Sequence, residues 1–187
     1  MKLAILVLED EPDVRDALMR DLATLMPTAR IEPAEDVEDA WEVIREIQTD
    51  GDRLALALCD HRLPGTTGVD FLVDMAGHAP TVETRKVLVT GQADLDDTVR
   101  AINNAQLDHY IAKPWSAEEL MSAARTQLTD YVEACGLNPI AHMKILDEQR
   151  ALELVSDMGH ADSRAALSTR SRNYQSGPSP LPGFTHL

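Results

Sequence analysis

Cysteine is scarce in this chain. Only Cys59 and Cys135 are present, and two cysteines fit neither a disulfide framework nor a zinc-ligand cluster. We therefore expect the protein to work in a reducing cytoplasm.

Long apolar runs are also missing. No apolar stretch approaches the roughly 18 residues that a membrane span needs. The short run after Met1 is too brief for the apolar region and cleavage site of a signal peptide. We expect no association with a membrane.

Positive charge is sparse over the first 135 residues. They carry 12 lysines and arginines against 27 acidic residues, a balance of −15, whereas residues 136–187 carry five of each. DNA binding requires a basic surface, so we expect no contact with DNA. Most of the acidic side chains serve solubility.

The 187 residues do contain apolar runs that alternate with amphipathic segments. Continuous runs of this kind, bounded by turn residues, are typical of strands buried on both faces of a sheet. The predicted strands are Leu3–Leu8, a short strand near an edge at Arg30–Pro33, Leu54–Cys59, Lys86–Thr90 and His109–Ala112. Five alternations of strand and helix predict a parallel sheet with helices on both faces.

Helices are predicted between these strands from the helical spacing of apolar residues. They run from Pro12 to before Pro27, from Val37 to before Asp50, around Val69–Met75, around Leu95–Ile102 and from Ser116 to before Gly136. Ser116 and Glu119 have the spacing of a capping box at the start of the last of these helices.

The C-terminal part predicts one more helix and a tail. Asn138 fits a helix cap and Pro139 the first helical position, and an apolar face then continues to Gly159, formed by Ile140, Met143, Leu146, Leu152, Val155 and Met158. Two arrangements stay open: this face packs on the preceding helix, or it pairs with a second chain. The expected division is a domain at 1–135, a helical extension at 136–160 and a flexible Ser/Pro/Gly-rich tail at 161–187.

Polar residues stand at the ends of four predicted strands: Glu9 with Asp10, Asp60, Thr90 and Lys113. The carboxyl ends of parallel strands meet at one edge of a sheet, so these side chains are expected to converge. Singly, each fits a cap, a turn or a solvated charge. Together, at the ends of four different strands, they predict a functional site at this edge of the sheet.

The chemistry of that site follows from its residue types. Three carboxylates repel one another and need a cation, and oxygen ligands without Cys or His favour Mg²⁺. Thr90 and Lys113 add a hydroxyl donor and a positive charge, which suit phosphoryl oxygens. Asp60 is then a competent nucleophile towards phosphorus, and an acyl phosphate is the product.

Four stretches carry a resemblance to a known family: L-V-L-E-D-E-P-D-V-R, L-C-D-H-R-L-P-G-T-T-G-V-D-F-L, V-L-V-T-G-Q-A-D and H-Y-I-A-K-P-W. Over about residues 1–132 the chain resembles the receiver domain of two-component response regulators. The resemblance implies a flavodoxin-like α/β fold in three layers, with a five-stranded parallel sheet of order 2-1-3-4-5.

The resemblance also implies roles for the acidic residues. Asp60 matches the phosphoacceptor, which receives its phosphoryl group from a histidine kinase or a phosphotransfer protein. Asp10 matches a Mg²⁺ ligand, Glu9 a residue that acts on the metal through water, and Arg62 the residue that offers its backbone carbonyl to the metal.

Further positions match the residues that respond to phosphorylation. Thr90 matches the switch hydroxyl, Lys113 the lysine of the site and Tyr110 the aromatic switch position. The bond between Lys113 and Pro114 is a candidate for the cis form. Trp115 has no matched role, and we expect it to be a surface or partner-facing aromatic beside the fifth helix.

The function implied by the resemblance is a signalling switch that catalyses only its own phosphorylation and dephosphorylation. Its contacts would change on the face formed by the fourth helix, fifth strand and fifth helix, and a homodimer could form through the fifth helix or residues 139–158. Three alternatives stay open: a phosphate sink or relay, a structural interaction module that does not signal, and the N-terminal part of a longer multidomain regulator.

Overall fold

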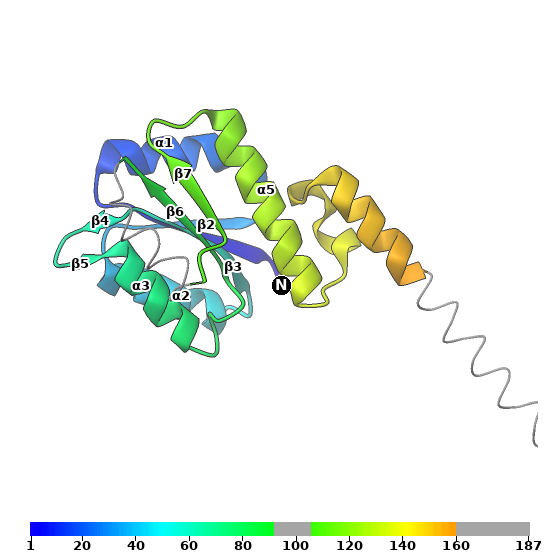
Figure 1. The fold of residues 1–187 in the computed structure, drawn as a ribbon. Coiled ribbons are helices and arrows are strands. Elements are labelled where there is room, and N and C mark those ends of the chain that lie inside the picture. The colour runs from blue at the N-terminus through cyan, green and yellow to red at the C-terminus, as the bar shows by residue number, and fades with distance from the viewer. Residues whose placement is uncertain (92–105, 160–187) are drawn as a thin grey trace, which may run out of the picture.

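A five-stranded parallel sheet forms the centre of the computed structural model, which describes residues 1–91 and 106–159. Its order is β2-β1-β3-β6-β7 (Figure 1), and this confirms the predicted order 2-1-3-4-5. The strands are β1 Leu3–Leu8, β2 Arg30–Ala34, β3 Arg53–Cys59, β6 Arg85–Thr90 and β7 His109–Ala112.

The central strands are buried along nearly their whole length. Every residue of β1 is buried, and so is every residue of β3 after Arg53, as continuous apolar runs in a parallel sheet require. Strand β2 forms one edge of the sheet, where Pro33 can be accommodated because an edge strand has one side without ladder hydrogen bonds.

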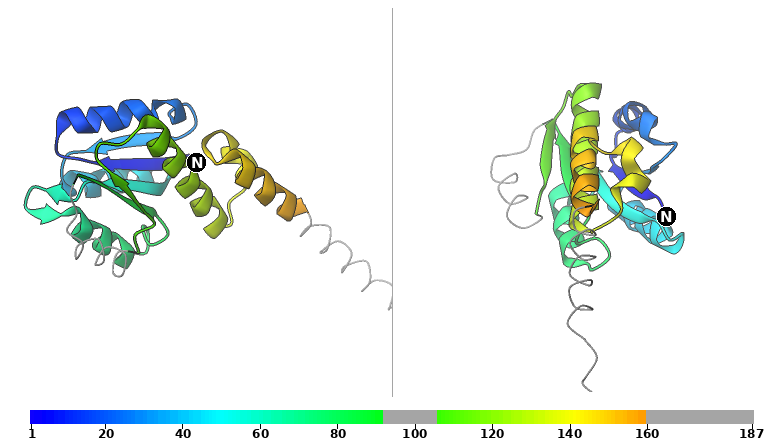
Figure 2. Two further views of the ribbon diagram at one scale, coloured as in Figure 1. Left: turned by 45° about the horizontal axis from the view of Figure 1, so that its top comes forward. Right: turned by 90° about the vertical axis from the view of Figure 1, so that its right-hand side faces the viewer.

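Helices cover both faces of the sheet and make it a three-layer domain (Figure 2). Helix α1 (Pro12–Leu22), with a single 3-10 turn η1 (Ala23–Leu25), and helix α5 (Ala117–Ala134) share one apolar core with the sheet. Helices α2 (Val37–Thr49) and α3 (Gly68–Gly77) share the other. The helix predicted around Leu95–Ile102 lies outside the described residues.

Side-chain caps begin three of these helices. The Asp36 side chain accepts from the backbone N–H of Asp39 at the start of α2. The Thr67 side chain accepts from the backbone N–H of Asp70 at the start of α3. Ser116 accepts from the N–H of Glu119 at 3.1 Å, which confirms that half of the predicted capping box. Helix α1 has no such bond at its N-cap.

A tight hairpin joins β3 to α3. Strands β4 (Arg62–Leu63) and β5 (Thr66–Thr67) are antiparallel, and Gly65 between them has a φ of 79°, which suits glycine. The hairpin brings the start of α3 back against the end of β3, where Asp60 lies.

The C-terminal segment differs from its prediction as one helix. It forms a 3-10 helix η2 (Pro139–Ile145) and then an α-helix over residues 148–159. Two hydrogen bonds explain the break: the Asp147 N–H donates to the Thr129 hydroxyl of α5 at 2.9 Å, and the Asp147 carboxylate accepts from the Arg150 N–H. Asp147 therefore caps a new helix instead of continuing the old one.

The predicted apolar face of this segment was also partly wrong. Ile140 and Leu152 are 62% and 55% exposed. Leu146 of the predicted face does enter the core at 1% exposed, together with Ile145 and Ala151, which the prediction did not include.

The segment packs in cis on α5 of its own chain (Figures 1 and 2). One guanidinium nitrogen of Arg125 donates to the backbone carbonyls of Lys144 and Leu146, each at 3.0 Å. Arg150 forms ion pairs with Asp130 and Glu133 of α5. The structure thus shows the cis arrangement for residues 139–151, and pairing with a second chain stays a prediction.

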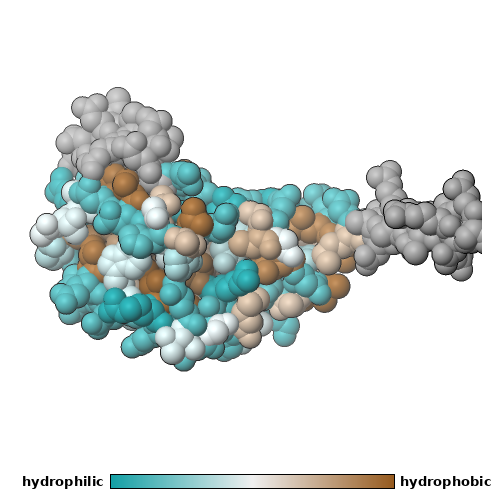
Figure 3. Space-filling view, turned by 90° about the horizontal axis from the view of Figure 1, so that it is seen from below, coloured by the Kyte–Doolittle hydropathy of each residue, from teal (hydrophilic) through white to brown (hydrophobic). Residues whose placement is uncertain are grey.

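Apolar side chains remain on the surface of this segment. Ile140, Leu152 and Met158 are exposed, and in Figure 3 hydrophobic side chains lie scattered among hydrophilic ones over this part of the molecule. None of the helices that the structure describes is long and apolar enough to cross a membrane.

Candidate functional site

The carboxyl edge of the sheet carries the polar residues that the sequence singled out. Glu9 and Asp10 directly follow β1, Asp60 follows β3, Thr90 ends β6 and Lys113 follows β7. Because all five strands are parallel, their ends meet there, and the structure brings these side chains together as predicted.

Lys113 joins two of the carboxylates. Its ammonium nitrogen lies 2.7 Å from Oε2 of Glu9 and 2.8 Å from Oδ1 of Asp60. Glu9 is 1% exposed and Asp60 6%. One cation therefore neutralises two nearly buried anions from different strands.

Backbone groups hold Asp60 from the other side. The Arg62 N–H donates to Oδ2 of Asp60 at 2.8 Å, and the Asp60 N–H donates to the carbonyl of Leu8 at 2.9 Å. The side chain of Arg62 does not make this contact. Whether its carbonyl serves a metal stays a prediction.

Asp60 borders a hollow of about 400 Å³ that opens to solvent. Polar and charged groups make up most of its wall. The lining residues are Asp10, Glu11, Asp60, Arg62, Thr90, Gly91 and Lys113. The hollow has the size and polarity for a phosphoryl group with a hydrated ion.

Burial and ionic contacts shift the pKa values of Glu9 and Lys113. Burial raises the pKa of Glu9, and the hydrogen bond and charge of Lys113 oppose that rise only in part. Burial alone would lower the pKa of Lys113, but its bonds to Asp60 and Glu9 outweigh burial and raise it. Lys113 is therefore held in its charged form at neutral pH.

The acidic residues fit a magnesium ion by their chemistry. One carboxylate oxygen from each of Glu9, Asp10 and Asp60 lies within 4.8 Å of the others. The set consists of oxygen donors only, and Asp10 remains partly exposed. This is the donor type that Mg²⁺ prefers, with room for retained water.

Thr90 and Tyr110, the residues of the predicted switch, contact each other beside the hollow, and the switch itself stays a prediction. Thr90 is 1% exposed and lines the hollow. Tyr110 is 37% exposed, and its hydroxyl donates to the backbone carbonyl of Thr90 at 3.4 Å. The Lys113–Pro114 peptide bond is cis, as expected.

Trp115 is only partly exposed, although a surface position was expected. It is partly buried against the core shared by α1 and α5, and its indole N–H donates to Asp21 of α1 at 3.1 Å. The ring thus ties the segment after Lys113 to α1 while it stays partly exposed, and its contact with a partner stays a prediction.

Two residues near the site escaped the sequence reasoning. Arg15 of α1 donates to the backbone carbonyl of Glu9 at 2.7 Å. Gly68 begins α3 so close to Asp60 that an added Cβ would lie 1.9 Å from the carbonyl oxygen of Asp60. The glycine-punctuated loop was visible in the sequence, but the close approach depends on the fold.

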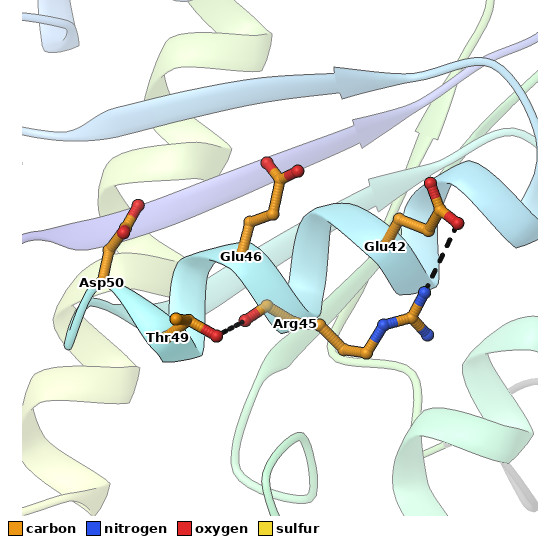
Figure 4. A pocket seen from close by; sticks show the side chains of 5 residues that line it. All are labelled: Glu42, Arg45, Glu46, Thr49 and Asp50. Atoms are coloured by element: carbon orange, nitrogen blue, oxygen red, sulfur yellow. Dashed lines mark hydrogen bonds and ion pairs between the residues drawn. The ribbon is translucent and has the colours of Figure 1, made fainter.

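A second hollow, also of about 400 Å³, lies along the solvent side of α2. Figure 4 shows its side chains along this one helix, with Arg45 paired to Glu42 at 3.6 Å and Thr49 bonded to the Arg45 carbonyl. These are local contacts within one helix, and the residues lie away from the strand ends.

The comparison with family models decides the identity of the fold. The model of the response regulator receiver domain matches residues 5–125. The chain belongs to this family. Receiver domains are signalling domains that accept a phosphoryl group, and family membership supports that role for this chain.

Two curated relatives illustrate the family. The hydrogenase transcriptional regulatory protein HoxA of Cupriavidus necator is 31% identical over 138 residues, which are 74% of this chain and 26% of HoxA. The phosphate regulon transcriptional regulatory protein PhoB of Escherichia coli is 26% identical over 147 residues, 78% of this chain and 57% of PhoB. This receiver chain thus spans about a quarter to somewhat over half of these relatives.

Solved receiver structures share the fold. A CheY-like receiver domain protein from Methanospirillum hungatei is 25% identical with a TM-score of 0.61, covering 72% of this chain and 99% of that one. The receiver domain of an HD domain-containing protein from Pseudomonas fluorescens is 24% identical with a TM-score of 0.62, covering 72% and 93%.

Proposed function

We propose that this receiver accepts a phosphoryl group on Asp60 from the phosphohistidine of a histidine kinase or phosphotransfer protein. The observation that carries the proposal is the double contact of Lys113 with Glu9 and Asp60 at the edge of a hollow that Asp10 and Thr90 also line. Carboxylates, a hydroxyl and a cation thus converge on one carboxylate that borders solvent.

Asp10, Asp60 and the Arg62 carbonyl would hold Mg²⁺, with Glu9 acting through water. When bound, the ion supplies positive charge that offsets the negative charge of the transferring phosphoryl group. No protein ligand beyond these oxygens is needed, because Mg²⁺ usually keeps several waters.

The transfer itself uses the carboxylate of Asp60 as nucleophile. One of its oxygens forms a bond to phosphorus while the bond from phosphorus to the donor's imidazole nitrogen breaks, and an acyl phosphate results. Lys113 offsets the charge on the phosphoryl oxygens, and the Thr90 hydroxyl donates to one of them. The only reactions catalysed would be this transfer and the hydrolysis of its product.

The readout would be a shift between two conformations. Thr90 would move towards the phosphoryl group, and Tyr110, now partly exposed, would turn inward. The phosphoryl group favours the second state only by the contacts that it makes better there. The surface of the fourth helix, β7 and α5 would change, and a kinase, a downstream protein or a second copy of the chain would detect it.

The test is phosphorylation of the chain with Mg²⁺ and a small phosphodonor. We expect one acid-stable, hydroxylamine-labile phosphate on the wild-type protein and none on Asp60→Asn or without Mg²⁺. Label on Asp60→Asn, or none on the wild type, would refute the proposal and leave a structural interaction module as the better reading.

A second measurement separates a switch from a phosphate sink. The mass in solution and partner binding would be compared with and without the phosphate mimic beryllofluoride, before and after deletion of residues 137–187. A change on activation supports the switch, and no change favours the sink. The transcriptional roles in the names of HoxA and PhoB belong to those longer proteins.

A further inference from the structure

The turn that carries Glu9 and Asp10 is held in an unusual way. Helix α1 begins at Pro12, and its N-cap residue Glu11 makes no side-chain cap hydrogen bond. The other described α-helices of the receiver core, α2, α3 and α5, each begin with a capping side chain. The start of α1 therefore lacks the side-chain cap that the other helices have.

Arg15 supplies a restraint from within the helix. One nitrogen of its guanidinium donates to the backbone carbonyl of Glu9 at 2.7 Å, across six residues. Over the part of the chain that the structure describes, no ion pair links Arg15 to a carboxylate. The side chain is partly buried and directs its charge at the peptide unit that joins Glu9 to Asp10.

The two acidic side chains depend on that peptide unit to different degrees. Glu9 is also held by Lys113 and by the N–H of Glu11. For Asp10, no side-chain hydrogen bond is recorded within residues 1–91 and 106–159. The position of the Asp10 carboxylate therefore depends on where its backbone lies, and the contact from Arg15 to the Glu9 carbonyl helps to hold that backbone.

We propose that Arg15 is a positioning residue for the magnesium site. This inference rests on the proposed function, in which Glu9, Asp10 and Asp60 hold the ion. Arg15 touches neither the phosphoryl group nor the ion. It fixes the carbonyl of Glu9 and thereby the orientation of the carboxylates that follow.

The direction of the change in Mg²⁺ affinity distinguishes a positioning role of Arg15 from a purely electrostatic one. A guanidinium beside a cation site repels Mg²⁺, so removal of a charge alone would tighten binding. Removal of a positioning contact loosens the ligand geometry and weakens binding, by 10- to 100-fold for typical residues that orient metal ligands. The two explanations thus predict opposite changes.

The experiment is a calorimetric Mg²⁺ titration of the full chain as wild type, Arg15→Gln, Arg15→Lys and Arg20→Gln. Arg20 is the matched control: it lies in the last turn of the same helix with a side chain 72% exposed, so its substitution removes an equal charge without touching the turn. We expect the Mg²⁺ dissociation constant of Arg15→Gln to rise about tenfold, and that of Arg20→Gln to change less than about twofold.

Arg15→Lys keeps the charge and the aliphatic stem but replaces the planar fork. We expect a smaller weakening, and this variant decides the question if thermal denaturation shows Arg15→Gln to be unfolded. If the wild type binds Mg²⁺ and the folded Arg15 variants bind it equally or more tightly, the inference about Arg15 is overturned while the proposed metal site stands. A wild type that does not bind Mg²⁺ would overturn the proposed metal site and this inference with it.

Discussion

Lys113 is the residue on which the charge balance of the site depends. It neutralises Glu9 and Asp60, which are almost wholly buried. Without a cation between them, two carboxylates would face each other at low exposure. Burial already raises the pKa of Glu9, and loss of Lys113 would remove its main opposing contact and leave only the hydrogen bond from the Glu11 N–H.

We therefore expect Lys113→Ala to lower the free energy of unfolding by roughly 3 kcal/mol in metal-free buffer, since removal of one partner of a buried ion pair leaves an uncompensated charge. Urea denaturation measures the change. The double variant Lys113→Ala/Glu9→Gln removes one of the orphaned charges and should regain much of the loss. An equal loss in both variants would contradict the electrostatic explanation.

At position 68, the close packing beside Asp60 requires glycine. A Cβ there would lie 1.9 Å from the carbonyl oxygen of Asp60 and 2.8 Å from the sulfur of Cys59. Cys59 ends β3 and Asp60 follows it; both are buried, and neither can move aside without displacing the Asp60 side chain.

Gly68→Ala should therefore cost about 3 kcal/mol of stability or more, as expected for overpacking against backbone, and slow phosphorylation of Asp60. Gly77→Ala, at the other end of α3, is the matched control, because no atom lies within 4 Å of its added Cβ. Thermal denaturation and phosphodonor labelling measure the two effects. Similar behaviour of the two variants would argue against the close approach.

At the scale of elements, the C-terminal segment is the main departure from expectation. Its 3-10 helix and the first turn of the helix at 148–159 join the core through Ile145, Leu146 and Ala151. The contacts of Arg125 and Thr129 with its backbone bind it to α5. This surface of α5 is thus occupied in cis, and pairing of two chains would have to use other surfaces.

Leu146→Ala is expected to destabilise the protein by roughly 3 kcal/mol, because the residue is 1% exposed and its removal leaves a cavity. Leu152→Ala, at a residue 55% exposed, should change stability by less than about 0.5 kcal/mol. Chemical denaturation compares the two. An equal loss for both, with stability that rises with protein concentration, would indicate pairing in trans instead.

At the scale of the whole molecule, the C-terminal segment returns to the start of the chain. His142 of η2 is 6% exposed. Burial lowers the pKa of His142, and the charge of the chain's amino terminus lowers it further. The folded state thus prefers the neutral imidazole.

A lowered pKa in the folded state gives a contribution to stability that is present above the ordinary value of about 6.5 and is lost as the pH falls through the folded value. We expect the thermal midpoint to fall between pH 7.5 and 5.5 by more in the wild type than in His142→Gln. The exposed His109 is the control, since His109→Gln should keep the wild-type difference. The same pH dependence in all three proteins would contradict the assignment to His142.

The sequence by itself determined the parallel sheet, most helix positions and the polar residues at the strand ends. These features follow from local patterns: apolar runs, helical spacing, and the rule that parallel strands end at one edge. Asp60 and Lys113 lie 53 positions apart, yet their convergence was predictable because each directly follows a strand.

Only the tertiary structure decided the break at Asp147, the packing of Trp115 on α1, the close approach of Gly68 to Asp60 and the contact of Arg15 with Glu9. Each depends on a partner that no local pattern names: Thr129 lies 18 residues before Asp147, and Asp21 lies 94 before Trp115. The apolar spacing of the C-terminal segment was compatible with one helix, and the hydroxyl of a packed neighbour changed that outcome. The spacing of apolar residues indicates which residues prefer burial, whereas tertiary packing decides which surface buries them.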